Sequence, residues 1–175
     1  HHFYGGFFKL LGLLMPGLTI RIDPALRRLR GSVVVNNHHS YLDPLLFQSI
    51  YARQATIVKS TFFQVPIFGG LINIAGYMPA SAEGPFGELM LQRMTTLRDF
   101  FASGGVMFVF PEGTRRPGRP IGALHEGAFK IARRCRVPLA LVRLRNTEQI
   151  FTPGQFFFHT TDPVTIESEL VHRVA

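Results

Sequence analysis

The sequence predicts a single α/β domain in which helices flank a mixed, mostly parallel central sheet. Two apolar runs, Val33–Val35 and Val106–Phe110, are typical of buried strands. Each run is followed by polar residues and then by a segment with helical spacing, which is the alternation expected of an α/β fold. The length of 175 residues suits one domain with a sizeable core.

The start of the chain differs in composition from the rest. We therefore divide the chain into an N-terminal segment (1–30) and a main domain (31–175). Residues 1–20 are rich in Phe, Leu and Gly, but the apolar run after Lys9 is shorter than the roughly 20 residues needed to span a bilayer. This run predicts either a helix in the membrane interface or a hydrophobic helix packed on the domain. The arginines of residues 21–30 would meet lipid headgroups or form a solvated face.

Further elements are expected along the main domain. Strands are predicted at Ala55–Lys59, Leu139–Val142, Phe156–His159 and Val164–Ile166, and helices at Pro44–Ile50, Glu88–Phe101 and Gly122–Cys135. The methionines of the second helix fall on its apolar face and are expected in the core. The single cysteine, Cys135, rules out an internal disulfide and is also expected to be a core residue.

The charge balance favours an anionic partner. The formal net charge is +8 at pH 7 and the pI is about 10.6. Such a balance is typical of proteins that bind nucleic acid, anionic membranes or acidic proteins. Because no recognisable nucleic-acid-binding module appears among the basic residues, we expect a membrane surface or an acidic protein and no nucleic acid.

The turn that follows the first strand carries a candidate catalytic pair. His38 leaves the strand end, and Asp43 lies where the next helix begins. A carboxylate that accepts the Nδ1 proton of an imidazole holds Nε2 free as a base. Asp43 before Pro44 is equally typical of a helix N-cap, and Ser40 with Asp43 is typical of a capping device. The turn by itself leaves both interpretations open.

A second motif follows the other strand and reads Phe110-Pro111-Glu112-Gly113-Thr114-Arg115. The pattern Asn37-His38-x-Ser40-x-x-Asp43, followed about seventy residues later by this block, resembles the glycerolipid acyltransferase family, of the lysophosphatidic acid or lysophospholipid acyltransferase type. The resemblance extends from about Val33 to Val142. It includes Lys59, which lies seven residues before a Pro66-x-x-Gly69 element.

The resemblance implies a site and a reaction. It implies that His38 and Asp43 are catalytic and that Lys59, Glu112, Gly113, Thr114 and Arg115 bind substrate. The reaction would move a fatty acyl group from an acyl-CoA or acyl-carrier-protein thioester to the hydroxyl of a lysophospholipid, most directly lysophosphatidic acid. The domain would work on a membrane surface at the cytoplasmic face, with no metal and no cofactor besides the acyl donor.

Roles within this site follow from the chemistry of acyl transfer. His38 would take the proton of the acceptor hydroxyl, and Asp43 would orient the imidazole. Backbone N–H groups at the start of the helix near Pro44, or near Glu112-Gly113, would hold the oxyanion. Arg115 with Lys59 would bind a phosphate, whereas Glu112 would hold Arg115 or bond a polyol hydroxyl. The basic loop 116–120 would track an anionic substrate.

One position departs from the family pattern. The family usually carries an acceptor-binding Arg shortly after the Tyr77-Met78 pair, where this chain has Pro79-Ala80-Ser81. This departure keeps two alternatives open, namely an acyltransferase for another lipid hydroxyl such as a lyso-aminolipid, and a catalytically inactive membrane-binding module.

Two other chemistries are disfavoured. A serine hydrolase based on Ser40 would need a triad in one short loop, and no Gly-x-Ser-x-Gly elbow occurs. A metal site made by His38, His39 and Asp43 lacks the helical His-Glu-x-x-His spacing. His39 is therefore expected to pack or cap.

Overall fold

A computed structural model of the chain describes residues 2–81, 84–115, 121–151 and 162–174. The expected strand at Phe156–His159 and the basic loop 116–120 lie outside the described residues. The strands are β1 (Leu18–Ile22), β2 (Ser32–Asn36), β3 (Gln54–Val58), β4 (Met78–Pro79), β5 (Val106–Val109), β6 (Leu139–Arg145) and β7 (Val164–Val174). The helices are α1 (His2–Leu14), α2 (Pro24–Arg28), α3 (Leu42–Ile50), α4 (Phe68–Ile74), α5 (Phe86–Ala102), α6 (Gly127–Cys135) and α7 (Thr147–Ile150), with a 3-10 helix η1 (Ser60–Gln64).

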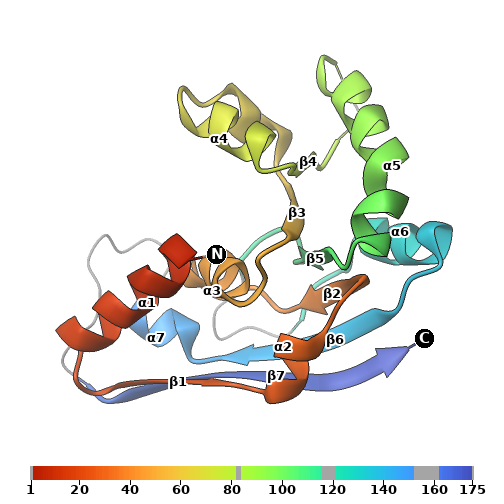
Figure 1. Cartoon of the computed structure of the whole chain (residues 1–175). Helices are drawn as coiled ribbons and strands as arrows, with labels where there is room; N and C mark the ends of the chain where they lie inside the picture. Colours follow the sequence, from red (N-terminus) through yellow and green to blue (C-terminus); the bar gives the residue numbers. More distant parts are fainter. Residues whose placement is uncertain (1, 82–83, 116–120, 152–161, 175) are drawn as a thin grey trace.

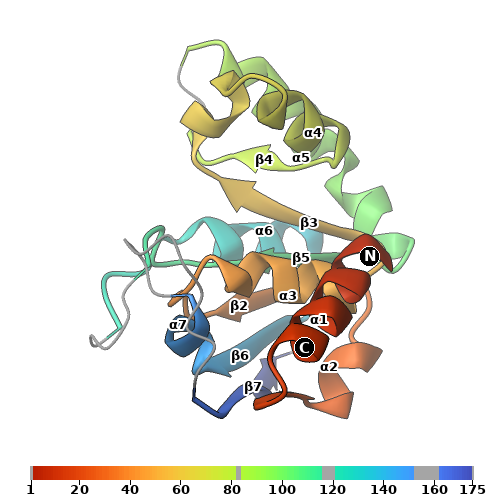
Figure 2. The same ribbon diagram turned by 90° about the vertical axis from the view of Figure 1, so that its left-hand side faces the viewer.

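The strands form one sheet in the order β1-β7-β6-β2-β5-β3-β4 (Figures 1 and 2). Strands β6, β2, β5, β3 and β4 run parallel to one another, β7 runs antiparallel to β6, and β1 runs parallel to β7. The predicted mixed, mostly parallel α/β sheet is therefore confirmed. Because β2, β5 and β3 are adjacent and parallel, the segments that follow them leave the same edge of the sheet.

Each face of the sheet is covered by its own group of helices. On β2 and β5, Val34 and Phe108 face a core built with α1, α2, α3 and α7. Their neighbours Val33 and Met107 face the opposite core, which is built with α5 and α6. A strand buried on both faces reads as a continuous apolar run, which is why these two strands were recognisable from sequence.

The N-terminal segment contributes a helix and an edge strand to this fold. Helix α1 buries Phe8 and Leu11 against the core, and Phe7 packs partly against it, whereas Leu10, Leu13 and Leu14 are exposed. The expected packing of this helix on the domain is therefore observed, and its contact with a membrane interface stays a prediction. Strand β1 pairs with β7 along its whole length. No helix in the described ranges has the length and hydrophobicity needed to cross a membrane.

Several element boundaries differ from the sequence-based prediction. Helix α6 begins at Gly127 rather than at Gly122, because the preceding residues bind the turn after β5. The Gly122 N–H donates to Glu112 Oε2 at 3.1 Å, and the His125 N–H donates to the Pro111 carbonyl at 2.8 Å. Helix α3 begins two residues before Pro44. Strands β1 and β4 and helices α2 and α4 were not predicted.

Phe47 tests the core on the α3 side of the sheet. Its side chain is fully buried, and its ring stacks on Phe108 with centroids 5.2 Å apart. We expect Phe47→Ala to lower the free energy of unfolding by about 3–5 kcal/mol, because it leaves a cavity between helix and sheet. Urea unfolding measures this change. The matched Phe3→Ala, at a side chain 79% exposed on α1, should change it by less than about 0.5 kcal/mol. Similar losses in the two variants would contradict this packing.

Candidate active site

The two sequence motifs meet at the edge of the sheet where β2 and β5 end. The turn after β2 carries His38 and Asp43, and the segment after β5 carries Glu112 to Arg115. The rings of His38 and Phe110 stack with centroids 4.0 Å apart and planes 25° apart, which joins the two segments. The sequence analysis did not assign a role to Phe110. Its aromatic side chain at the end of a predicted strand was the signal that could have indicated a contact with the His38 turn.

The His38 imidazole is held by the Asp43 carboxylate. Nδ1 of His38 lies 2.8 Å from Oδ2 of Asp43. The Asp43 side chain is fully buried, whereas the His38 side chain is 12% exposed. Because an ionised carboxylate only accepts hydrogen bonds, Nδ1 carries the proton in the neutral ring and Nε2 carries the lone pair. The ring is therefore fixed in the tautomer that a general base requires.

The same carboxylate also closes the turn. Oδ2 of Asp43 accepts the backbone N–H groups of His39 at 2.7 Å and of Ser40 at 2.8 Å. Ser40 Oγ accepts the Leu42 N–H at 3.2 Å. The His38 contact and the capping-type hydrogen bonds therefore share one carboxylate oxygen, and the catalytic role of the pair stays a prediction. These bonds also occupy N–H groups at the start of α3 that were expected as possible oxyanion donors.

Two further contacts fix the turn to the rest of the domain. The Asn37 side chain bonds both backbone groups of Leu144 on β6, accepting its N–H at 2.7 Å and donating to its carbonyl at 2.8 Å. Ser40 Oγ donates to the Phe151 carbonyl at 2.9 Å. The turn is thus held from β6 and from the end of α7, so the position of His38 is set by tertiary contacts as well as by its own loop.

The Glu112-Gly113 pair forms a tight turn directly after β5. The Gly113 N–H donates to the Phe110 carbonyl at 3.1 Å, and Gly113 has φ +65°. This positive φ favours glycine, and a Cβ at this position would also lie 3.2 Å from the His125 ring, a tight contact that would require the ring to shift slightly. Glu112 is buried, and its Oε2 accepts the Gly122 N–H. Thr114 is exposed.

Arg115 lies over an aromatic ring of the first motif. Its guanidinium carbon is 3.6 Å from the centroid of the Tyr41 ring, in a cation–π arrangement. Tyr41 in turn lies 5.3 Å from the Phe151 ring. No ion pair joins Arg115 to Glu112 in the described part of the chain. Stacking on Tyr41, which the sequence did not indicate, therefore places this cation beside the His38 turn.

Lys59 lies one strand beyond β5, at the end of β3, and is exposed. In the parallel pairing of β3 with β4, Val58 lies opposite Pro79. The next residues along the two segments, Lys59 and Ala80, are therefore neighbours at this end of the sheet. The Ala80 N–H donates to the Val58 carbonyl at 2.8 Å. Lys59 thus lies beside Pro79-Ala80-Ser81, the stretch in which the resembled family usually carries an Arg.

His39 points away from this pair and contacts α7. Its Nδ1 lies 3.4 Å from Glu148 Oε2, so it packs at the side of the site as expected. Among the residues that the structure describes, no group of three or more His, Cys, Asp or Glu side chains is arranged to hold a metal ion.

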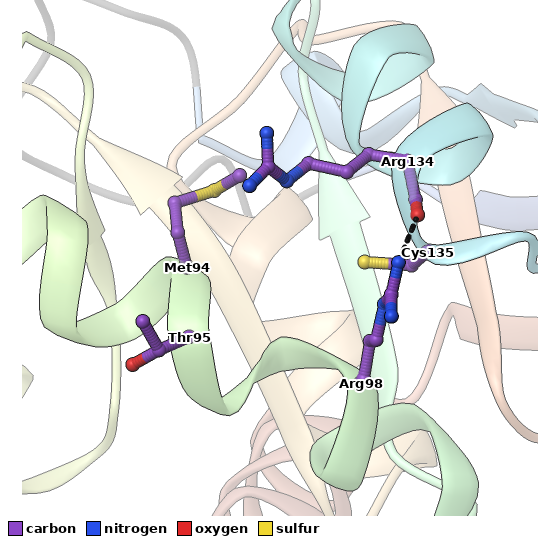
Figure 3. A pocket seen from close by; sticks show the side chains of 5 residues that line it. All are labelled: Met94, Thr95, Arg98, Arg134 and Cys135. Atoms are coloured by element: carbon purple, nitrogen blue, oxygen red, sulfur yellow. Dashed lines mark hydrogen bonds between the residues drawn. The ribbon is translucent and has the colours of Figure 1, made fainter.

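A cavity of about 520 Å³ lies between α5 and α6, away from both motifs (Figure 3). It is lined by Met94, Thr95, Arg98, Arg134 and Cys135. The Arg98 guanidinium donates to the Arg134 carbonyl at 3.4 Å across this cavity. The cavity shares no residue with the turn of His38 or with the segment after β5. The candidate chemistry therefore does not take place there.

Fold and site together define an α/β domain that carries a hydrogen-bonded His-Asp pair and a nearby Arg at adjacent strand ends. The model of the Acyltransferase family matches residues 18–144, and the chain belongs to this family. A chloroplastic 1-acyl-sn-glycerol-3-phosphate acyltransferase of Brassica napus is 32% identical over 123 residues, and one of Arabidopsis thaliana is 30% identical over 159 residues. These alignments cover 70% and 88% of this chain.

The relatives are longer than this chain, which spans 35% of the Brassica protein and 43% of the Arabidopsis protein. The fold is also that of a solved structure. The crystal structure of the 1-acyl-sn-glycerophosphate acyltransferase PlsC from Thermotoga maritima superposes with a TM-score of 0.70 at 20% identity. That match covers 98% of this chain and 67% of the Thermotoga chain.

Cys135 tests the environment of the α5–α6 cavity. Burial raises the pKa of its thiol, and the Arg98 and Arg134 guanidiniums oppose this shift only in part. A raised pKa leaves less thiolate at pH 8, so iodoacetamide should alkylate Cys135 more slowly than a small free thiol, and the rate should still be rising above pH 9. Mass spectrometry of the intact chain measures this rate, because the chain has one cysteine. Alkylation as fast as that of the free thiol would contradict the partly buried position of Cys135.

Proposed function

We propose that this domain transfers a fatty acyl group from a thioester to the hydroxyl of 1-acylglycerol-3-phosphate, a step of phospholipid biosynthesis. The observation that carries the proposal is the 2.8 Å contact between His38 Nδ1 and Asp43 Oδ2, at a strand end that also bears a cation on Arg115. The two plant relatives are named for activity on this acceptor.

The reaction proceeds by direct attack of the acceptor on the thioester. Nε2 of His38 takes the hydroxyl proton as the oxygen attacks the carbonyl carbon, and Asp43 stabilises the resulting imidazolium. The tetrahedral intermediate then expels the thiolate, and the imidazolium returns the proton to the sulfur. Since the N–H groups of His39, Ser40 and Leu42 are occupied, we place the oxyanion beside the Glu112–Arg115 segment.

The acceptor phosphate is bound by the two cations at this edge. Arg115 is oriented by the Tyr41 ring, and Lys59 lies beside Ala80, within the stretch that lacks the family's Arg. Lys59 therefore supplies the positive charge that this stretch lacks. Glu112 and Gly113 shape the turn that presents Thr114 and Arg115 to the substrate.

The donor is an acyl-CoA or an acyl carrier protein, and no further cofactor takes part in this chemistry. Both donors are anionic, which suits a chain with a formal charge of +8. The domain works on the cytoplasmic face of a membrane, where the acceptor lipid resides. Exposed apolar side chains of α1, such as Leu13, support contact with the membrane interface.

One observation favours a different class of acceptor, a lipid that carries less negative charge. The stretch Pro79-Ala80-Ser81 lacks the Arg that the family usually carries, so an acceptor with less negative charge, such as a lyso-aminolipid, would lose less binding here. An inactive membrane-binding module is the remaining alternative. The experiments below separate these functions.

Free-thiol release from palmitoyl-CoA tests the reaction. We expect release that depends on lysophosphatidic acid, and we expect His38→Ala to slow it by about 100- to 10,000-fold, because the variant lacks the positioned base. His39→Ala is the matched control, since its imidazole contacts Glu148 instead, and it should keep most of the activity. Release that needs His38 but ignores lysophosphatidic acid would reject this acceptor. No His38-dependent release with CoA or carrier-protein donors would favour the inactive module.

Lys59 tests the phosphate site. Lys59→Met should raise the KM for lysophosphatidic acid about tenfold with a smaller effect on kcat, because a charged contact to the phosphate is lost. Adding Ala80→Arg should lower the KM again, since the neighbouring strand then carries the cation. Lys130→Met, at an exposed lysine paired with Glu126 on α6, is the control. A KM unchanged by Lys59→Met would remove Lys59 from the site.

A further inference from the structure

One part of the molecule presents apolar side chains to solvent without any charge among them. The sequence has no Asp, Glu, Lys or Arg from Ser60 to Ser81, although charged residues make up 17% of the chain. In the structure this stretch begins with η1 and α4, here called the α4 lobe (residues 60–77). Figures 1 and 2 show that it projects beyond the β4 edge of the sheet. Its exposed apolar residues are Phe62, Val65, Ile67, Phe68, Leu71 and Ile74.

The lobe is held in place by a close internal fit. Gly69 lies against η1, where an added Cβ would clash with the Phe63 carbonyl. Ile72 and Tyr77 are buried, and the Gln48 side-chain amide donates to the Tyr77 hydroxyl. The Arg93 guanidinium donates to Asn73 at 2.6 and 2.9 Å. A few side chains thus tie the lobe to the domain, and its outward apolar residues are carried on a fixed frame.

Ile67 is the most informative of these residues. It is 85% exposed, and it has φ +65°, a left-handed conformation that is unfavourable for a β-branched side chain. Glycine would adopt this conformation without strain. Backbone strain together with an isoleucine side chain in water stabilises nothing in the isolated domain. The strained backbone and the exposed side chain together indicate that Ile67 contacts something outside this domain.

We propose that the α4 lobe inserts its apolar side chains into the membrane interface, with Ile67 at its tip. A bilayer accepts apolar side chains without charged or hydrogen-bonding partners, which a protein partner would normally supply at the rim of an interface. The lobe begins directly after Lys59, and a cation at this margin suits anionic headgroups. The inference rests on the proposed function in one respect, because an amphiphilic acceptor lies in the bilayer beside the same strand end.

Vesicle binding tests the lobe independently of catalysis. We expect the chain to sediment with vesicles of phosphatidylcholine and phosphatidylglycerol, and we expect a variant with Ile67→Asp, Leu71→Asp and Ile74→Asp to bind at least about tenfold more weakly. Val171→Asp, at a half-exposed valine on β7, is the matched control and should bind like the wild type. Leu13→Asp reports separately on the exposed face of α1.

A single substitution keeps the test valid if the triple variant fails to fold. Ile67→Gly removes the tip side chain and relieves the positive φ, so the thermal stability should stay equal or rise while vesicle binding falls. Binding by both variants within twofold of the wild type would overturn the proposal. Unchanged vesicle binding combined with loss of a wild-type dimer in size-exclusion chromatography would also overturn it, in favour of a second copy of the chain.

The acyltransferase assay separates this inference from the proposed function. The lobe variants should keep turnover of a short-chain lysophosphatidic acid that is monomeric in water and should lose turnover of the same acceptor class in vesicles. Equal turnover of both acceptors by the variants would overturn the membrane role and leave the acyltransferase intact. No turnover by the wild type would reject the proposed function while the sedimentation result still decides the lobe.

Discussion

One oxygen atom organises the candidate site. Oδ2 of Asp43 accepts hydrogen bonds from the His38 ring and from the backbone of His39 and Ser40, all at 2.7 to 2.8 Å. These bonds do two things at once, since they fold the residues after β2 into a closed turn and fix the imidazole tautomer. A buried carboxylate without such donors would be strongly disfavoured, so the turn and the His-Asp pair stabilise each other.

The order of the parallel strands determines which residues contact the His38 turn. β2 and β5 are paired over four residues, so Phe110 leaves the edge next to the His38 turn and stacks on its ring. The neighbouring strand β6 supplies Leu144 as an anchor for Asn37. A residue two positions beyond a strand end is usually mobile, yet this one is held from both adjacent strands. The fixed position of the His38 ring therefore follows from strand order, which is a property of the whole fold.

The sequence predicted the fold class and the central strands because β2 and β5 are buried on both faces and so are apolar at every position. It did not predict β1, whose alternating residues pair with a strand more than 140 positions away. The sequence-based prediction started α6 too early, because the helical spacing of apolar residues extends back to Leu124. In the structure, hydrogen bonds from Gly122 and His125 hold this backbone against the segment after β5 instead. The motif residues were recognisable as patterns. The contact of Arg115 with Tyr41 was not, since it depends on how two loops meet.

This edge of the sheet has a charged part and an apolar part, as a lysolipid does. Arg115 lies beside the His38 turn and Lys59 lies at the end of β3, two strands along the same edge, whereas the stretch after Lys59 carries no charge and exposes Ile67 and Leu71. An amphiphile has the same division, with an anionic headgroup joined to an apolar tail. A soluble phosphorylated acceptor would gain nothing from the apolar lobe, and a neutral lipid would gain little from the two cations. The two surfaces along one sheet edge therefore support the proposed acceptor, which is both anionic and membrane-borne.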